Sequence, residues 1–380
     1  MQDNEPLVVA GAVLALRLYD VAHAIDLPSV ERIWADQPRP ASSRLRLIST
    51  PTKAVAFGVA PVEVPLAPVT LDLPDGPVTA TVLARLYDFG VVTLALRVPA
   101  ERLGFAAFTG LVNAVDRAVG THAVAAVPWP DLLQQVRTTF ADALTRPSEN
   151  GLEEDYLLGM VEAFDTPMTA EALQTRIDLV PLLSGETRPL AASARADLLA
   201  RRFSYYTDDF VALTWDRAFI YEPRGDSDVL DALEVANAQL LEMRYYDELL
   251  DDELPRMYDL VEGMQRARSF LSSRRFAGLA RRLYGLVAEV TELTERVDNA
   301  LQVTEDVYLA RVYGAALELF RVSAVSAAVD RKLSIVRDTY AALYEEASSG
   351  RAAVMEAAVV VLICVEVGLA LWPLWPLWRH

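Results

Sequence analysis

Short apolar runs separated by prolines and turn residues fill the first 225 residues and predict strands. Two longer runs flank Tyr87-Asp88-Phe89-Gly90, whose composition is typical of a hairpin connection. Apolar residues recur at helical spacing from Phe105 to Val115 and from Leu132 to Phe140. The pattern predicts a mixed α/β domain over residues 1–226, with a loop near 146–152 between two halves. Strands are expected at residues 45–48, 54–57, 62–64, 78–86, 91–98, 177–183, 210–215 and 218–222.

Prolines and strand patterns become rare after residue 226, so residues 227–350 are expected to be helical. Here apolar residues recur at alternating spacings of four and three, which is the pattern of a coiled-coil seam. The same rhythm returns from Leu333 to Leu343. The spacing is compatible with an antiparallel hairpin, with a stalk that pairs between subunits, and with an ordinary helical bundle inside one chain. The seam residues are Leu279, Leu283, Leu286, Val290, Leu293 and Val297.

The C-terminal residues 351–380 read as a membrane anchor. Residues 357–371 form an apolar run that as a helix spans only about 22 Å, which falls short of a hydrocarbon core about 30 Å thick. The continuation WPLWPLW adds apolar length, and its rings Trp372, Trp375 and Trp378 suit the boundary between lipid and water. We therefore expect one transmembrane helix, with a buried soluble helix as the alternative.

Two glutamates, Glu356 and Glu366, interrupt the apolar tail. A carboxylate near the bilayer centre costs about 2.5 to 3.5 kcal/mol on the insertion scale, which the surrounding valines and leucines about offset. A single helix cannot bury Glu366 alone, so oligomerisation is the simplest way to shield it. The alternatives are a shallow position from which Glu366 reaches the interface, and a ring of Glu366 side chains lining a pore.

Composition narrows the choice of partners and compartment. The 53 acidic residues exceed the 35 basic ones and give a formal charge of −18, which repels a phosphate backbone and argues against nucleic-acid binding by the bulk surface. The lone Cys364 cannot form an intramolecular disulfide and suits a reducing compartment. No basic export signal precedes the first apolar run. We expect the bulk of the chain to be cytoplasmic.

No phosphate-binding loop, zinc-spaced cysteine and histidine set or nucleophile elbow is present in the sequence. The densest polar cluster lies at 242–253, where carboxylates four residues apart could share a divalent cation, form a solvated face or meet a basic partner. We expect neither a catalytic site nor a cofactor. The acidic members are Glu242, Asp247, Glu248, Asp251, Asp252 and Glu253.

The chain resembles the YagE-like family required for meiotic nuclear division, which shares the domain of unknown function 155. The resemblance lies in LEVANAQLLEMRYYDELLDDELPRMYDLVEG from Leu233, in VDRKLSIVRDTYAALYEE and in MEAAVVVLICVEVGLAL, with weaker matches in LYDVAHAID and YDFGVVTL. Asp330, Lys332 and Leu333 stand near the family's first element, and Glu356 and Glu366 match its two glutamates. The resemblance implies a membrane-anchored protein with no established catalytic activity.

Together these observations predict an α+β protein: a mixed α/β domain, then a helical coiled-coil hairpin or stalk, then one C-terminal transmembrane helix. The expected function is a membrane-anchored, oligomeric scaffold or assembly factor that holds an unidentified protein partner. A pore-forming or accessory membrane protein, and an enzyme with an unrecognised site in the α/β domain, are the alternatives.

Overall fold

A computed structural model describes most of the chain. The described residues are 5–36, 43–44, 55–57, 59–120, 127–148, 151–225, 228–266, 278, 281, 283–285, 287–288, 290–291, 301–303 and 307–371. The chain divides into two compact units, the first of residues 1–245 and 294–325, the second of residues 246–293 and 326–380. The predicted domain limits at residues 226 and 350 remain predictions, because contacts alone do not show which segment folds by itself.

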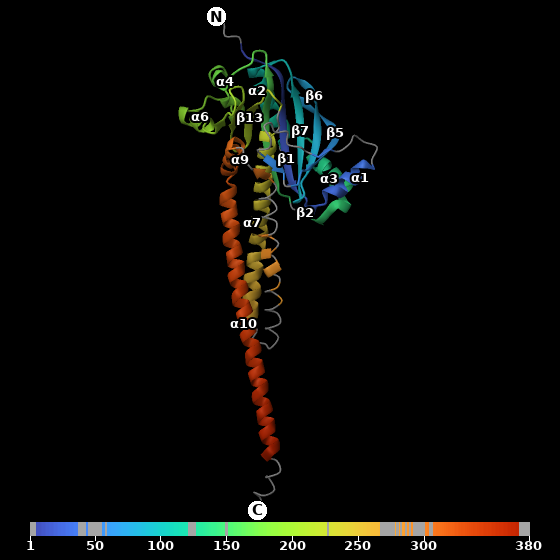
Figure 1. Ribbon diagram of the computed structural model, residues 1–380, viewed down its shortest axis with the longest axis vertical. Coiled ribbons are helices and arrows are strands. Elements are labelled where there is room, and N and C mark those ends of the chain that lie inside the picture. The colour runs from blue at the N-terminus through green and yellow to red at the C-terminus, as the bar shows by residue number, and fades with distance from the viewer. Residues whose placement is uncertain are drawn as a thin grey trace, which may run out of the picture. The chain divides into compact units, whose positions relative to one another are not determined.

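The first unit is built on a mostly antiparallel sheet of order β11-β12-β13-β10-β1-β7-β6-β5-β3, with β8 also paired to β1 (Figure 1). Within that sheet β10 and β13 run parallel, and two short pairs, β14 with β4 and β2 with β9, lie outside it. The strands are β1 (Leu7–Asp20), β2 (Ala22–Ile25), β3 (Ser43–Arg44), β4 (Val55–Phe57), β5 (Val62–Leu73), β6 (Gly76–Leu86), β7 (Val91–Ala100), β8 (Leu103–Gly104), β9 (Leu144–Pro147), β10 (Glu153–Phe164), β11 (Arg202–Phe203), β12 (Phe210–Leu213), β13 (Arg217–Tyr221) and β14 (Leu301–Val303).

Short helices connect the strands, and long helices dominate the second half of the chain. The short ones are α1 (Leu27–Ala35), α2 (Phe105–Val119), α3 (Trp129–Thr139), the 3₁₀ turn η1 (Ala141–Ala143), α4 (Ala170–Arg176), α5 (Val180–Ser184) and α6 (Ala192–Leu198). The later ones are α7 (Asp228–Arg266), α9 (Val307–Leu319) and α10 (Val322–Leu371). The limits between the two units fall inside α7 and α10. The protein is therefore of mixed α+β class, with an N-terminal sheet domain and C-terminal helices.

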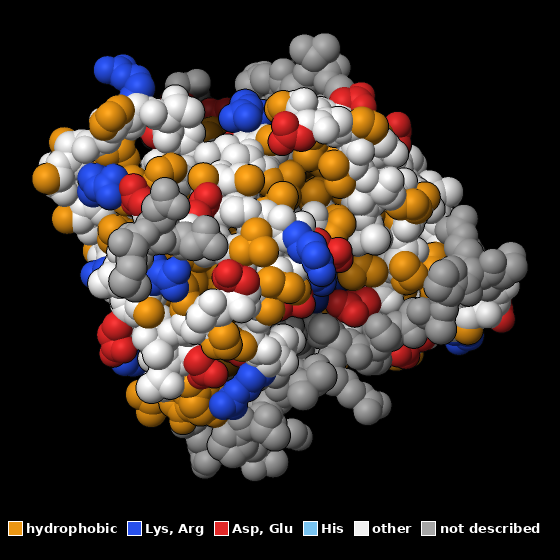
Figure 2. Space-filling model, turned by 90° about the horizontal axis from the view of Figure 1, so that it is seen from above, with side chains coloured by type: hydrophobic (Ala, Val, Ile, Leu, Met, Phe, Trp, Pro, Cys, Tyr) orange, Lys and Arg blue, Asp and Glu red, His pale blue; other side chains and the backbone are white. Residues whose placement is uncertain are grey.

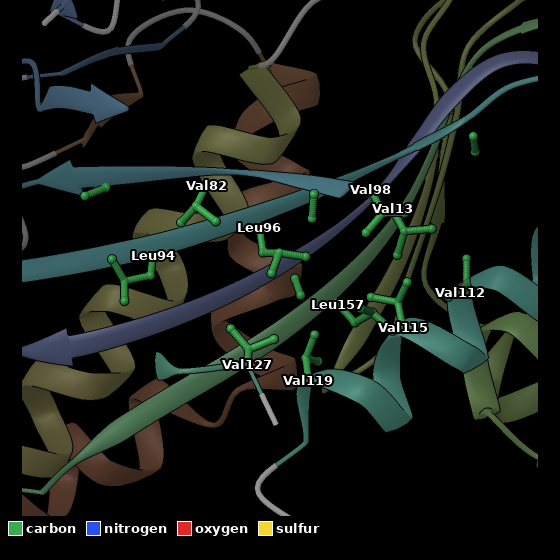
Figure 3. Packing of buried hydrophobic residues seen from close by; sticks show 14 of the residues in the cluster. Val13, Val82, Leu94, Leu96, Val98, Val112, Val115, Val119, Val127 and Leu157 are labelled. Atoms are coloured by element: carbon green, nitrogen blue, oxygen red, sulfur yellow. The ribbon is translucent and has the colours of Figure 1, made fainter. Parts of the chain in front are cut away.

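One face of the sheet packs on α2 and forms the main core. Val82, Leu96 and Val98 of the strands belong to the same buried cluster as Val112 and Val115 of α2, part of which Figure 3 shows. These residues are all less than a tenth exposed. Burial of an aliphatic side chain of this kind contributes about 1.5 to 3 kcal/mol, so this face is the main source of the domain's stability.

The other face of the sheet is buried as well. In β1 the alternate residues Leu14, Leu16 and Leu18 point away from the α2 face, because side chains alternate along a strand, and all three are buried. A hydrogen bond from Arg85 Nη1 of β6 to Asp231 Oδ1 of α7 places the first turns of α7 on this second face. The central strands therefore lack the polar and apolar alternation of a half-exposed strand.

The second unit contains the later part of α7, most of α10 and the described residues of 278–291. Lys332 of α10 lies 2.7 Å from both Asp247 Oδ1 and Asp251 Oδ1 of α7. The described seam residues Leu283 and Val290 are buried, whereas Tyr284 beside them is exposed. Buried apolar side chains and ion pairs between α7 and α10 thus stabilise this unit.

The structure confirms several predicted elements and corrects one. The hairpin of β6 and β7 and the pairing of β12 with β13 are confirmed, as are the helices α2 and α3. The strand predicted at 177–183 is wrong, because residues 180–183 belong to helix α5 and residues 177–179 form no strand. Asp178 accepts a hydrogen bond from the Val180 amide at the start of the helix, and Pro181 has no amide hydrogen for a strand ladder. A short apolar run of this length does not distinguish a strand from a buried helix.

The apolar tail forms part of α10. Along residues 359–367 the aliphatic side chains are exposed by 52 to 69%. Among the described residues no single helix has both the length and the apolar character needed to cross a membrane. One bent pair, Val307–Leu319 with Val322–Ala342, passes that test by length and composition, with 62° between the two helices.

Two glycines, Gly76 at the start of β6 and Gly90 in the turn between β6 and β7, provide a matched test of the hairpin. Gly90 (φ +102°) and Gly76 (φ +118°) both adopt a backbone conformation that favours glycine. A Cβ on Gly90 would collide with the backbone carbonyl oxygen of Ala22, whereas a Cβ on Gly76 meets nothing within 4 Å. We expect Gly76→Ala to lower the free energy of unfolding by about 1 to 3 kcal/mol from backbone strain alone. Gly90→Ala should lower the free energy of unfolding clearly more. Equal losses in urea denaturation would contradict the close packing of Gly90 against Ala22.

Candidate functional site

A buried ion cluster joins β6 to α7 on the second face of the sheet. Arg85 donates from Nε to Glu63 Oε1 at 2.8 Å, and from Nη1 to Asp231 Oδ1 at 2.8 Å and Glu234 Oε2 at 2.6 Å. The hydroxyl of Tyr87 donates to Glu234 Oε1 at 2.8 Å. Asp231 and Glu234 are 0% exposed. Glu63 faces Arg85 across the strands β5 and β6, so sheet register sets this part of the cluster.

The protonation states of Arg85 and Tyr87 are fixed by their surroundings in the cluster. Burial by itself lowers the pKa of Arg85, but the carboxylates of Glu234 and Asp231 outweigh that effect and raise it well above its usual value. Burial raises the pKa of Tyr87 well above its ordinary value, and the nearby Glu234 carboxylate raises it further. Arg85 therefore stays charged and Tyr87 stays protonated. The cluster is suited to fixing α7 on the sheet rather than to exchanging protons.

A cavity of about 750 Å³ lies in the first unit. Side chains from five separate segments line it, which is an arrangement that a ligand pocket commonly has. The lining includes Glu154 and Asp155 of β10, Arg201 before β11, Trp215 between β12 and β13, Asn237, Leu240 and Arg244 of α7, and Glu318, Leu319, Phe320, Arg321 and Val325 around the junction of α9 and α10.

Two ion pairs order the wall of the cavity. Arg244 donates a hydrogen bond to Glu154, and Arg201 Nη2 lies 2.7 Å from Glu318 Oε1. Burial raises the pKa of Glu154, and the hydrogen bond and charge of Arg244 oppose that rise. The pair of Arg201 and Glu318 is largely exposed and contributes little to stability. Its arginine can therefore exchange partners at small cost.

The buried Tyr156 contacts residues of the cavity wall without lining the cavity itself. Its hydroxyl donates to the carbonyl oxygens of Thr214 at 3.0 Å and Arg217 at 2.9 Å, which fixes the turn that carries Trp215. Its ring meets Phe320 edge-on with centroids 5.3 Å apart. Burial raises the pKa of Tyr156 well above its usual value. The turn and the α9–α10 junction are thereby tied to one buried tyrosine.

The residues singled out from the sequence do not assemble into one site. Glu366 is exposed on α10, and Glu356 lies in the same helix. Of the seam, Leu283 and Val290 are buried. The remaining predicted site residues, including the side chain of Glu356, lie outside what the structure describes: Leu279, Leu286, Leu293, Val297, Trp372, Trp375 and Trp378.

The acidic residues at 242–253 do not form one site, because different basic side chains pair with different members. Lys332 joins Asp247 and Asp251, which occupy the same helix face four residues apart. Arg256 joins Asp252 and Glu253, and Glu242 is buried. Among the described residues no group of three or more histidine, cysteine, aspartate and glutamate side chains is placed to hold a metal ion. Figure 2 shows another face of the molecule, where basic and acidic side chains are interspersed among the coloured residues.

Sequence reasoning missed the two features that the structure assembles. The sequence offered two indications of the buried ion cluster. Arg85 is a charged residue within an apolar strand, and Asp231 and Glu234 lie one helical turn apart in an apolar stretch. Buried charges of this kind are rare unless they are paired. Nothing in the linear sequence indicated that Trp215 and Arg321 line one cavity, because more than a hundred residues separate them.

Comparison with known families identifies the sheet domain. Residues 10–228 match the model of the family described as uncharacterized protein MJ0711, N-terminal domain. The chain belongs to this family. A relative is the uncharacterized protein MJ0711 of Methanocaldococcus jannaschii, 24% identical over 194 residues, which are 51% of this chain and 58% of the relative. The match thus spans little more than half of the relative's length. No solved structure matches the chain.

The family corrects the predicted resemblance to YagE-like proteins. The matching domain covers residues 10–228, most of which lie where that resemblance was weakest, and no comparison supports the YagE-like family. The matched domain ends at Asp228, so it contains Arg85, Glu154 and Trp215 but not Asp231, Asn237 or Arg321.

The ion cluster leads to a stability prediction with a control on the adjacent strand. Arg85→Leu leaves Asp231 and Glu234 buried without their arginine, and loss of one partner of a buried ion pair costs about 3 to 5 kcal/mol. Arg97→Leu removes a pair to Glu162 whose side chains are 50% and 41% exposed, and should cost less than about 1 kcal/mol. Chemical denaturation of both variants measures the difference. Losses of similar size would show that the Arg85 cluster does not fasten the helix.

Proposed function

We propose that this protein is a membrane-anchored scaffold or assembly factor, with its sheet domain attached to a bilayer through the C-terminal part of α10. The observation that carries the proposal is the exposed apolar surface of residues 359–367. Exposed apolar surface of this extent is uncommon in a monomeric soluble protein and marks an interaction site. The exposed aliphatic residues are Val359, Val360, Val361, Leu362, Ile363, Val365 and Val367.

The distribution of these residues favours lipid as the partner. A helix that packs on one protein surface needs only an apolar stripe, whereas consecutive apolar positions cover its whole circumference. Hydrocarbon can cover every side of such a helix. Residues 351–371 are helical in α10, which at 1.5 Å per residue corresponds to about 30 Å, the thickness of a hydrocarbon core. The tryptophans that follow in the sequence suit the interface.

Oligomerisation is the second part of the proposal. Glu366 lies within the exposed apolar run, and a carboxylate facing lipid is costly unless a polar partner shields it. The burial of Leu283 and Val290, seven residues apart, supports helix pairing of the coiled-coil type along the seam. We propose a homo-oligomer whose tails shield Glu366, with the bulk of each chain on the cytoplasmic side.

A pore is the alternative within the same arrangement, because a closed ring of Glu366 side chains would create a polar path between helices. The number of chains distinguishes the two ideas. A dimer or trimer supports a scaffold, whereas a larger closed ring favours a pore.

Removal of the tail tests attachment. A chain that ends at Arg351 should move from the membrane fraction to the supernatant, because the apolar surface that requires lipid is absent. The full chain should resist extraction with alkaline carbonate. As a control, Val307→Arg changes an exposed valine outside the tail, 74% exposed, and should leave the fractionation unchanged. Release of the full chain by carbonate would exclude integral insertion.

Substitution of Glu366 tests oligomerisation separately. Glu366→Leu removes the polar contact and the insertion cost together, so it should strengthen membrane retention and weaken the specific oligomer. Glu366→Gln retains hydrogen bonding and should have a smaller effect. The measurement is the mass and thermal dissociation of the complex in detergent. Identical values for all three proteins would leave Glu366 without a role in assembly.

A further inference from the structure

Arg321, between α9 and α10, has a backbone conformation and a position that are unfavourable for arginine. Its φ of +57° lies in the left-handed region, which costs an L-residue about 1 to 2 kcal/mol. It immediately precedes α10, whose first turn contains no acidic residue, although negative charge is favoured at a helix N-terminus. No ion pair of Arg321 is present among the described residues, in contrast to Arg201 and Arg244 in the same cavity.

Asn237 contributes a buried polar group to the same cavity. The residue is 2% exposed and lines the cavity wall. Its Nδ2 donates to the carbonyl oxygen of Leu233 at 3.0 Å. Its Oδ1 is not one of the fully buried side-chain atoms that lack a partner in the described part of the chain, so as a residue of the cavity lining Asn237 offers this oxygen as an acceptor to the cavity. A ligand donor in the cavity would satisfy it.

Trp215 presents a flat apolar ring to the same space. It is 73% exposed, and the turn that carries it is fixed by Tyr156 and by a hydrogen bond from the Arg217 amide to Thr214 Oγ1 at 3.1 Å. An indole ring held on a rigid turn can stack on a planar group with little loss of conformational entropy.

The charges on the wall limit what can bind. Glu154 and Glu318 each pair with an arginine, whereas Arg17, which lies 3.8 Å from Asp155, also pairs with Glu153 at 3.0 Å. Arg321 makes no ion pair among the described residues, although Asp155 lines the same cavity. The three carboxylates of the wall would repel a polyphosphate, so a ligand with a single anionic group suits the cavity better.

We infer that the cavity binds a small molecule with a planar ring and a single phosphate group, the class to which nucleoside monophosphates belong. Arg321 binds the phosphate, Trp215 stacks on the ring, and Asn237 accepts a hydrogen bond from a ring or sugar donor. The exposed Arg201 can leave Glu318 to provide a second contact with the phosphate. The volume of about 750 Å³ lies within the range of small-molecule pockets.

Calorimetry on the full-length protein in detergent tests this inference. The probes are the four nucleoside 5′-monophosphates, with the matching nucleosides lacking the phosphate and inorganic phosphate lacking the ring. At least one monophosphate should bind, at least about 10-fold more tightly than its nucleoside, since charge-assisted hydrogen bonds are roughly twice as strong as neutral ones. Binding should quench the fluorescence of Trp215, and Trp215→Phe should remove that part of the signal.

Arg321→Gly separates binding from folding. Glycine adopts a positive φ without strain, so the unfolding midpoint should stay the same or rise, while affinity for the monophosphate should fall about 10-fold or more. Arg102→Gly is the matched control, because Arg102 has a φ of +55° and is exposed but does not line the cavity. It should bind like the wild type. Absence of binding by every monophosphate, or equal affinity in Arg321→Gly and the wild type, would overturn the inference.

Discussion

The ion cluster around Arg85 is the interaction on which the organisation of this chain depends. A sheet that is apolar on both faces requires cover on both sides, and α2 covers one of them. Arg85 joins α7 to the other through Asp231 and Glu234. Apolar contacts alone would allow a helix to slide over the sheet, whereas a guanidinium bonded to three carboxylates has one favourable arrangement. The beginning of the longer helical region is thus fixed by a single buried arginine.

The same placement of α7 creates the cavity. Once Asp231 and Glu234 are fixed, Asn237, Leu240 and Arg244 follow along the helix and face Glu154 of β10. The junction of α9 and α10 contributes the remaining wall, and Tyr313 of α9 donates to Gln239 of α7 at 2.9 Å. The proposed ligand site therefore needs the helical segments that follow the family domain. A relative that shares only the sheet domain would lack Asn237 and Arg321.

Membrane attachment and ligand binding are independent proposals that rest on different physical arguments. The proposed membrane attachment depends on apolar surface whose exposure to water is unfavourable, and it does not require an open cavity. The proposed ligand binding depends on a strained arginine and a buried amide, and it does not require the C-terminal tail. Residues that depart from local conformational and charge preferences are most often found at functional sites. Arg321 has a positive φ, and it places a positive charge at a helix N-terminus, where negative charge is favoured.

The sequence by itself determined the class of the fold, the β6–β7 hairpin, the helices α2 and α3, and the change to helices after residue 226. These features depend on neighbours within a few residues, whose spacing and turn chemistry are visible in the chain. It did not identify the central strands β1 and β10, because strands buried on both faces lose their alternation. Only the tertiary structure decided that residues 180–183 belong to helix α5, that Lys332 meets Asp247, and that Arg85 meets Glu234. Such pairs join residues about 85 or 150 positions apart, and no local pattern encodes which distant charge will neutralise another.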